Sequence, residues 1–381
     1  MNELATRFPV IDRHVWLNHA AISPWPLAVA QAMRAFVDDN TDHGPLHYAQ
    51  WLEIEGRLRQ RAATLLGGQA DDVALVKNTS EGLSLVAGGL PWSAGDRLVY
   101  CRDDFPSNML PWQQLVPDTV EKIAVPVAVT VDGDDPEAAL IAAIDDRTRL
   151  VAVSSVRYDS GLRLDLERIS AACRRHGALF VVDAIQHLGA LPLDVAGGIA
   201  DFIVCGSHKW LLAPEGLALF WSSPEARAHM RPVQVGWRMW PDMFNFARAD
   251  WTVPEPARRF EPGTLNMAGI HGLDAALGLL LEYDASTRSR ALLERSGRLI
   301  EGLAEIAGIE LITPREPARR AGIVSFRGHG LNPHKLHRVL AENDIHAAIR
   351  GTALRLSPHF YTPPEQLDRT LEIIARHAGG N

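Results

Sequence analysis

Short apolar runs rich in β-branched residues alternate with longer amphipathic segments over residues 73–222. The run at 149–156 is apolar on both faces. The segment at 165–177 instead repeats apolar residues every three or four positions, between a capping Asp165 and a terminating Gly177. Strands that are apolar on both faces and separated by helices are typical of a parallel sheet covered on both sides. The pattern therefore predicts an α/β domain with a mostly parallel sheet between helices.

The pattern changes after about residue 280, where a long charged helix at 288–308 is followed by strand, helix, strand and helix. This order indicates a smaller α+β domain at the C-terminal end. We expect a large domain over residues 16–265 and a small domain over residues 266–381, which residues 1–15 join.

Composition excludes several classes of protein. The chain has 381 residues, a net charge of −8 and no basic run, which argues against a nucleic-acid partner. It contains no run of about 18 uncharged apolar residues, so we expect no membrane span. Residues 1–16 lack the apolar core of a signal peptide, which favours a cytoplasmic location. Three widely spaced cysteines, Cys101, Cys173 and Cys205, fit buried reduced thiols better than a disulfide framework.

Two of the apolar runs end on residues that carry charge. Asp183 follows the run 179–182, and Lys209 follows the run 201–206 after Ser207 and His208. In a parallel sheet, ligands lie beyond the carboxyl ends of the strands. A buried carboxylate costs several kcal/mol unless a cation or donors meet it, roughly the scale for unpaired buried charge. Each residue also has a simpler explanation: Asp183 as a helix cap, Lys209 as a surface lysine whose stem covers apolar neighbours.

Pyridoxal phosphate accounts for both charged residues together. An acid keeps the pyridine nitrogen protonated, so that the ring accepts electrons, and a lysine forms the Schiff base with the cofactor's aldehyde. The motifs D-A-x-Q at 183–186 and H-K-W-x-x-x-P-x-G at 208–216 resemble those of the class V aminotransferase family, in the branch of cysteine desulfurases and isopenicillin N epimerases. The resemblance covers nearly the whole chain.

The resemblance implies the fold, the assembly and the cofactor-binding residues. It implies a fold-type I transferase with a seven-stranded sheet, acting as a homodimer with shared active sites and binding pyridoxal phosphate. Phe105 would stack on the ring where many relatives have a histidine, although a plain core phenylalanine also fits. With Lys209 and Asp183 it forms the expected catalytic set. The expected cofactor-binding residues are Thr79, Ser80, Asp183, Gln186, Ser207, His208, Lys209 and Thr264.

The cofactor contacts each follow from a matching stretch. Thr79 and Ser80 open a helix whose free amides can bind the phosphate, unless they are an ordinary cap. Gln186 would donate to the phenolic oxygen, and His208 would help to fix the phosphate side. Thr264 would reach the phosphate of the neighbouring subunit, although turn chemistry alone also explains its Pro-Gly-Thr context.

The substrate is expected to be an amino acid. Arg355 alternates with Leu354 and Leu356 as a half-buried strand requires, and its fork of donors suits the substrate carboxylate. Arg350 is a second candidate for this contact. The other expected substrate-binding residues are Asn18, Ala20 and Tyr158.

Three departures from the family pattern affect function. Gly206 stands where relatives often have a phosphate-binding serine or threonine, so either Ser207 substitutes or the contact is missing. Tyr158 stands where desulfurases have an asparagine, which favours the epimerase-like branch. No cysteine follows Cys205, although the desulfurase nucleophile lies just before the carboxylate-binding arginine; without that thiolate no persulfide forms by the usual route.

The reaction expected by resemblance passes through an external aldimine and an α-carbanion. β-Elimination, as in a carbon–sulfur lyase, is our first expectation. Transamination and epimerisation share the same carbanion and remain alternatives, as does a binding protein that has kept the fold and lost turnover. We expect no metal site: His43 and His47 are four residues apart, but Gly44 and Pro45 break the helix that a zinc pair would need.

Overall fold

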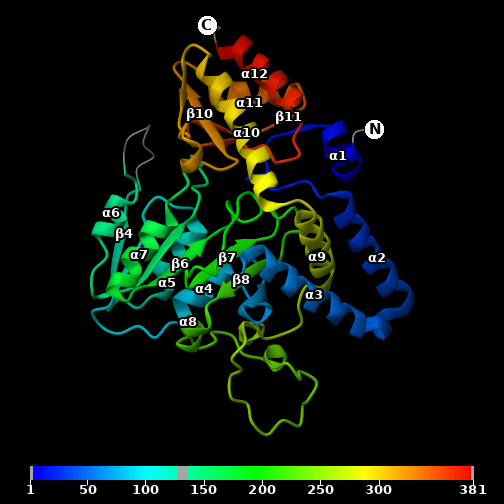
Figure 1. The fold of residues 1–381 in the computed structure, drawn as a ribbon, viewed down its shortest axis with the longest axis vertical. Helices are drawn as coiled ribbons and strands as arrows, with labels where there is room; N and C mark the ends of the chain where they lie inside the picture. The colour runs from blue at the N-terminus through cyan, green and yellow to red at the C-terminus, as the bar shows by residue number, and fades with distance from the viewer. Residues whose placement is uncertain (1–2, 128–134, 379–381) are drawn as a thin grey trace.

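A seven-stranded sheet lies at the centre of the computed structural model, which describes residues 3–127 and 135–378 (Figure 1). Its order is β2-β8-β7-β6-β5-β3-β4. The pairs among β3 to β7 are parallel, and β8 runs antiparallel to both β2 and β7. The mostly parallel sheet is thus confirmed. The strands are β2 (Val73–Val76), β3 (Arg97–Cys101), β4 (Glu121–Val125), β5 (Thr148–Ser154), β6 (Leu179–Asp183), β7 (Phe202–Gly206) and β8 (Ala218–Ser222).

Helices cover both faces of this sheet, because successive side chains on a strand point to opposite faces. On β6, Phe180 and Val182 pack into one core with α2, α3, α6, α7 and α9. Val181 packs into a second core with α4, α5 and α8. These helices are α2 (Leu27–His43), α3 (Tyr48–Leu66), α4 (Thr79–Gly89), α5 (Leu110–Leu115), α6 (Ala138–Ala142), α7 (Leu166–His176), α8 (Pro224–Ala228) and α9 (Met267–Glu282).

The ends of α7 follow the sequence signals. The Asp165 side chain accepts a hydrogen bond from the N–H of Arg168, and Gly177 ends the helix at a φ of 68°. That left-handed conformation suits glycine, which has no Cβ. Each such helix returns the chain to the amino end of the next strand, so the carboxyl ends of β5, β6 and β7 lie along one edge.

A second, four-stranded sheet has the order β12-β13-β10-β9. Apolar side chains of α10, α11 and α12 pack on it and form a third core. The N-terminal strand β1 (Val15–Trp16) pairs in parallel with β11 (Ile345–His346), next to this sheet. The other elements are α1 (Glu3–Arg7), β9 (Ile309–Leu311), β10 (Val324–Gly328), β12 (Ala348–Arg350), β13 (Ala353–Leu356), α10 (Ala285–Ala304), α11 (Pro333–Glu342) and α12 (Pro364–Ala378).

The division of the chain at residues 265 and 266 stays a prediction. Helix α9, which lies just after that point, buries Ile270 and Leu273 in the first core of the large sheet. Residues 1–2 and 379–381 of the expected small domain lie outside the described residues. Within the described ranges, none of the helices has the length and apolarity needed to cross a bilayer.

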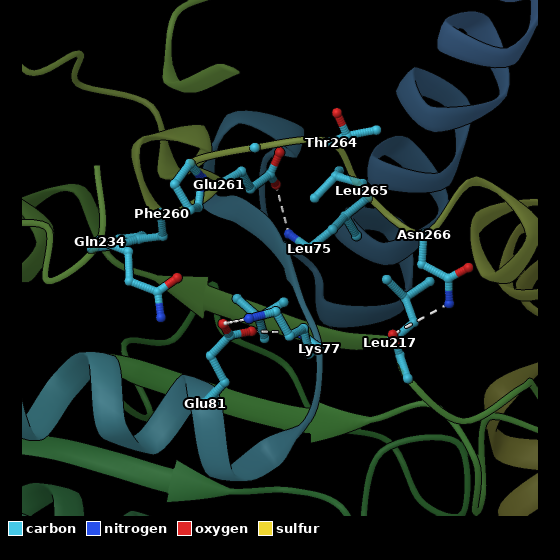
Figure 2. Close-up of a pocket in the computed structure, with 14 residues that line it drawn as sticks. Leu75, Lys77, Glu81, Leu217, Gln234, Phe260, Glu261, Thr264, Leu265 and Asn266 are labelled. Carbon is cyan, nitrogen blue, oxygen red and sulfur yellow. Dashed lines mark hydrogen bonds and ion pairs between the residues drawn. The ribbon is translucent and has the colours of Figure 1, made fainter. Parts of the chain in front are cut away.

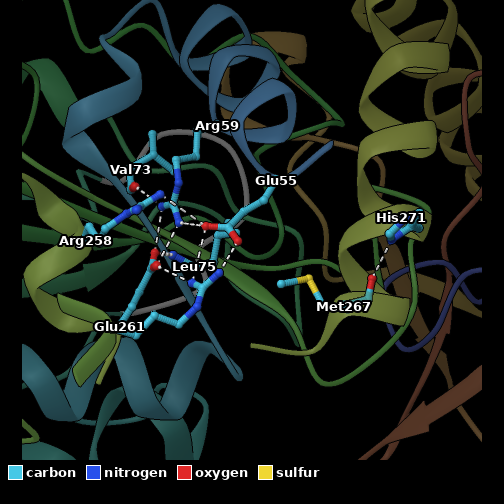
Figure 3. Close-up of polar contacts among 9 residues, drawn as sticks. Glu55, Arg59, Val73, Leu75, Arg258, Glu261, Met267 and His271 are labelled. Atoms are coloured by element: carbon cyan, nitrogen blue, oxygen red, sulfur yellow. Dashed lines mark hydrogen bonds and ion pairs between the residues drawn. The ribbon is translucent and has the colours of Figure 1, made fainter. Parts of the chain in front are cut away.

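A buried ion network fixes the segment that leads to Thr264 (Figure 3). Arg59 on α3 donates from Nη1 to Glu261 at 2.6 Å and from Nη2 to Glu55 at 2.7 Å. Glu261 also accepts the backbone N–H of Leu75 at 2.7 Å. Arg238 pairs with Glu55 as well, so both carboxylates meet several donors away from water. We call Glu55, Arg59, Arg238 and Glu261 the structural ion network.

Candidate active site

Asp183 ends β6 in the middle of the sheet edge, beside Ser154 of β5 and Val204 of β7. Its side chain is buried. Among the described residues, its carboxylate accepts one hydrogen bond, from the N–H of Ile185 at 3.0 Å. Burial raises the pKa of Asp183, although the positive charge of Lys209 opposes the shift. A cationic partner would therefore stabilise the charged form of this buried carboxylate.

Lys209 lies in the turn that follows β7, and its side chain is 8% exposed. Burial lowers the pKa of Lys209, and Asp183 opposes this shift while Arg355 and Arg350 reinforce it. Lys209 Nζ stands 5.6 Å from the ring centre of Phe105. The lysine is thus not a surface residue, and the charges of Asp183 and Lys209 act on each other.

Phe105 lies at the mouth of the site and not in a core. It is 42% exposed, and its ring meets that of Tyr158 edge to face with centres 5.3 Å apart. The exposure does not fit a plain core phenylalanine. Between Lys209 and Tyr158, the face of Phe105 is placed to contact an aromatic ligand.

Arg355 on β13 is almost fully buried, and no carboxylate among the described residues pairs with it. Its Nη1 donates to the backbone oxygen of Tyr158 at 2.6 Å. Within the part of the chain that is described, its Nε and Nη2 have no hydrogen-bond partner. Burial lowers the pKa of Arg355, and the nearby charge of Arg350 lowers it further. One edge of this guanidinium is left for an anion such as a substrate carboxylate.

The N-terminal loop after β1 comes next to the same edge. Asn18 bridges to Ser357, and the N–H of Ala20 donates to the Ser357 hydroxyl at 3.0 Å. Gln186 Nε2 donates to the oxygen of Ala20 at 3.0 Å, while Gln186 Oε1 accepts the Trp210 indole N–H. Gln186 keeps one amide hydrogen for the phenolic oxygen that the resemblance assigns to it.

The surroundings of Gly206 explain why this position does not carry the serine or threonine that relatives often have. The N–H of Gly206 donates to Thr79 Oγ1 at 3.1 Å. A Cβ on Gly206 would lie 2.9 Å from Ile185 Cδ1 and 3.2 Å from Thr79 Oγ1, so a side chain does not fit without a shift. Ser207 does not replace it: its hydroxyl is buried and points at the carbonyls of Pro214 and Leu217, the latter at 2.7 Å. Its one proton is therefore not free for a phosphate.

Ser80 and His208 stand at the border of the site. Ser80, at the start of α4, has its Oγ 2.8 Å from Ser107 Oγ. The N–H of Glu81 donates to the Asn78 side chain, so among the described residues the N–H groups of Thr79 and Ser80 are the ones left for an anion. His208 is half-buried, and burial together with Lys209 lowers its pKa. The imidazole of His208 is therefore biased toward its neutral form.

Thr264 is not brought together with the other predicted residues. It is exposed, on the rim of a hollow of about 260 Å³ that Lys77 and Glu81 also line. Figure 2 shows Thr264 and the Lys77–Glu81 pair on opposite sides of this hollow. Within one subunit, no contact found among the described residues links Thr264 to Lys209.

Sequence reasoning missed Asp104. This carboxyl group is buried beside Phe105, accepts the Phe105 N–H at 2.7 Å and accepts the Ser154 hydroxyl at 2.9 Å. Burial raises the pKa of Asp104, and its charge in turn raises that of Asp183. The only available signal was an acid next to Phe105, which the resemblance assigns to the cofactor ring. Asp104 positions that residue and the end of β5.

One negative expectation needs correction. Helix α2 does end at His43, as Gly44 and Pro45 predicted. The turn nevertheless brings His47 Nδ1 to 2.6 Å and His43 Nδ1 to 3.3 Å from the same oxygen of Asp39. The helix break therefore does not separate the two imidazoles.

The residues at the sheet edge fit pyridoxal phosphate. A buried carboxylate with a single backbone donor suits a protonated ring nitrogen, and a buried lysine is near it. Helix amides beside Thr79 suit a phosphate, and the free edge of Arg355 suits the carboxylate of an amino acid. The donor set thus matches each part of the cofactor and of its substrate.

Comparison with known proteins agrees with these observations. The chain is 29% identical to a probable cysteine desulfurase of Methanothermobacter thermautotrophicus, over 96% of each chain. It is 27% identical to an uncharacterized aminotransferase of Bacillus subtilis, over 97% of this chain and 95% of the other. A structure of the protein C-DES with glycine linked to its pyridoxal-phosphate cofactor covers 99% of both chains, with a TM-score of 0.91 and 25% identity.

The sequence profile of the class V aminotransferases matches residues 15–355. This range includes both strand-end motifs and extends to Arg355. The chain therefore belongs to the class V aminotransferase family of pyridoxal-phosphate-dependent enzymes, as its motifs predicted.

Proposed function

We propose that the protein is a carbon–sulfur lyase that catalyses β-elimination from a sulfur-containing amino acid, without a cysteine nucleophile. The state of its three thiols carries this proposal. Cys101, Cys173 and Cys205 are buried, and burial raises the pKa of each thiol. A neutral, inaccessible thiol is a poor nucleophile. The sulfur of the substrate must therefore leave without transfer to the protein.

A relative supports the same reaction class. C-DES, described as a cystine C–S lyase, was solved with its product cysteine persulfide; its structure matches with a TM-score of 0.90 and 25% identity. In such an elimination the α-proton leaves, the Cβ–S bond breaks and the sulfur departs with its electron pair. Water then converts the remaining three-carbon fragment into pyruvate and ammonia.

Each of four side chains would have a separate role in this elimination. When bound, pyridoxal phosphate supplies an electron sink for the charge at the α-carbon. Asp183 would hold the ring-nitrogen proton, and Phe105 would cover the ring. The free edge of Arg355 would orient the substrate carboxylate, which determines the bond that breaks. Lys209, whose pKa is lowered by burial, would take the α-proton as a base.

We further propose that the enzyme is a homodimer in which Thr264 serves the partner's site. Thr264 is exposed in its own subunit, where no contact found among the described residues links it to Lys209. The adjoining segment 233–251 extends away from the body at the lower edge of Figure 1 and exposes apolar side chains, an arrangement typical of interfaces. They are Val233, Val235, Phe244, Phe246 and Trp251.

The test is a product screen of the holoenzyme with L-cystine, L-cysteine and L-alanine. We expect pyruvate and ammonia in equal amounts from cystine, together with a persulfide, and no persulfide on the protein. The variants Cys101→Ala, Cys173→Ala and Cys205→Ala should each keep this product pattern. Keto-acid formation from alanine, or α-hydrogen exchange without elimination, would favour transamination or epimerisation instead. Loss of turnover in one folded cysteine variant would show a thiolate mechanism.

A further inference from the structure

A cluster of two histidines and one aspartate lies where the two ends of the chain meet. His14 Nδ1 is 2.7 Å and His346 Nε2 is 3.3 Å from the same oxygen of Asp344. The three ligand atoms all lie within 4.8 Å of one another. None of these residues belongs to the predicted active site.

The backbone holds this cluster in place. The N–H of Val15 donates to the oxygen of Asp344 at 3.1 Å, and Trp16 pairs with His346 across β1 and β11. The Trp16 ring packs on the His346 ring with centres 5.0 Å apart. Asp344 has a φ of 60°, in the left-handed region that aspartate and asparagine tolerate best after glycine. Strand pairing and ring packing thus hold Asp344 and His346 in place.

The donor set is that of a zinc-type ion. Two imidazole nitrogens and a carboxylate oxygen bind Zn²⁺ at about 2.0–2.2 Å, which sets tetrahedral ligands roughly 3.3–3.5 Å apart. His346 and Asp344 already have this separation. On that geometry the distance from His14 Nδ1 to the Asp344 oxygen must increase by less than about 1 Å. The His14 side chain is 47% exposed and has room for this movement. A water would take the fourth position.

We propose that His14, Asp344 and His346 bind one divalent transition-metal ion such as Zn²⁺. The ion fastens strand β1 to β11, and β1 leads directly into the loop with Asn18 and Ala20. It therefore acts at the base of a predicted substrate loop without touching the reaction. This inference does not depend on the reaction that the enzyme catalyses.

Asp39, His43 and His47 form a second His–His–Asp cluster and provide the matched control. There, the Trp51 indole N–H donates to the other carboxylate oxygen of Asp39 at 2.9 Å. These three residues and Trp51 all come from the continuous stretch 39–51. Their contacts are therefore also explained by a structural role in joining α2 to α3. Removing it by His43→Ala with His47→Ala gives a background in which the proposed site is the one cluster of this kind left among the described residues.

The experiment is calorimetric titration of the chelator-treated holoenzyme with ZnCl₂. In the double-alanine background we expect one equivalent of Zn²⁺ to bind. Adding His346→Ala, His14→Ala or Asp344→Asn should weaken this binding at least about tenfold, as for other lost metal-site interactions. Asp344→Asn keeps a residue that tolerates the left-handed conformation, and circular dichroism checks the fold. Absence of binding in the background, or unchanged affinity after these substitutions, overturns the proposal.

Discussion

The structural ion network and the candidate active site are both buried groups of charges, but their charges are compensated differently. Glu261 accepts three short hydrogen bonds, two from Arg59 and one from Leu75. Among the described residues, Asp183 accepts one, and Arg355 finds no carboxylate. The first group is nearly complete within the chain, whereas the second lacks partners that a ligand can supply.

Their electrostatics differ in the same sense. Burial opposes charge at Glu55 and Arg59, yet their ion pairs prevail, so the pKa of Glu55 is lowered and that of Arg59 is raised. At Asp183 and Lys209, burial prevails and moves both pKa values toward neutral forms. The difference teaches that burial alone does not mark an active site; buried charge without sufficient partners does.

The largest expected effect is that of Lys209→Ala. Turnover should fall below detection, because the substitution removes the group proposed to take the α-proton, and the visible colour of the bound cofactor should change or vanish. Steady-state kinetics and absorption spectra measure both. Lys335→Ala, an exposed residue of α11, is the control. A colourless parent protein that stays colourless with added cofactor would contradict the assignment.

The next effect is on stability and comes from the other region. Glu261→Gln should cost about 3–5 kcal/mol of unfolding free energy, because it leaves Arg59 and Arg238 buried with too little negative charge. Urea unfolding measures this loss. Glu310→Gln, in an exposed pair with Arg327, should cost much less, because solvent screens an exposed ion pair. Equal losses in the two variants would remove the distinction between the regions.

Asp183→Asn should act on rate and hardly on stability. Turnover should drop about 10²–10³-fold, roughly 3–4 kcal/mol of transition-state stabilisation, because a neutral amide does not hold the ring protonated. Asp201→Asn is the control: Asp201 is a carboxylate with a raised pKa that accepts the N–H of Phe180, away from the site. Near-parental turnover in Asp183→Asn would refute its role.

Arg355→Met gives the smallest expected change and the sharpest comparison. KM should rise about 10–100-fold, since charge-assisted hydrogen bonds are worth roughly 1.5–3 kcal/mol. Unfolding free energy should stay equal or increase, because an incompletely paired buried charge is replaced by an apolar side chain. Arg355→Lys should rescue KM poorly, since a point charge lacks the fork. A silent Arg355→Met would move the carboxylate contact to Arg350.

Those parts of the fold that depend on local pattern could be predicted from the sequence. The runs that became β2, β3, β5, β6, β7 and β8 are apolar on both faces, and that signal is independent of their partners. β4 was missed because Glu121–Val125 is an edge strand that is only partly buried. The edge position is decided by which strands pair, which no local pattern reports.

Site residues could be predicted where they belong to a sequence motif. They could not be predicted where their role depends on contacts between residues far apart in the sequence. Asp183 ends β6 and Lys209 lies in the turn after β7, so their positions at one edge follow from a parallel sheet. Asp104 was missed because its partner Ser154 lies on β5, 50 positions away in the sequence. The hydroxyl of Ser207 is occupied by carbonyls of a turn seven to ten residues later, which spacing alone does not show.

The pairing of β1 with β11 gives the enzyme an order of assembly during translation. Residues 14 and 344, which flank that pairing, are separated by 330 positions in sequence. At about 5–20 residues per second, the ribosome needs roughly 15–65 s to make the second strand after the first. Until then the loop with Asn18 and Ala20 has no strand to anchor it. A nascent chain that already holds the large sheet therefore has no finished substrate loop until residues 345 and 346 have been added.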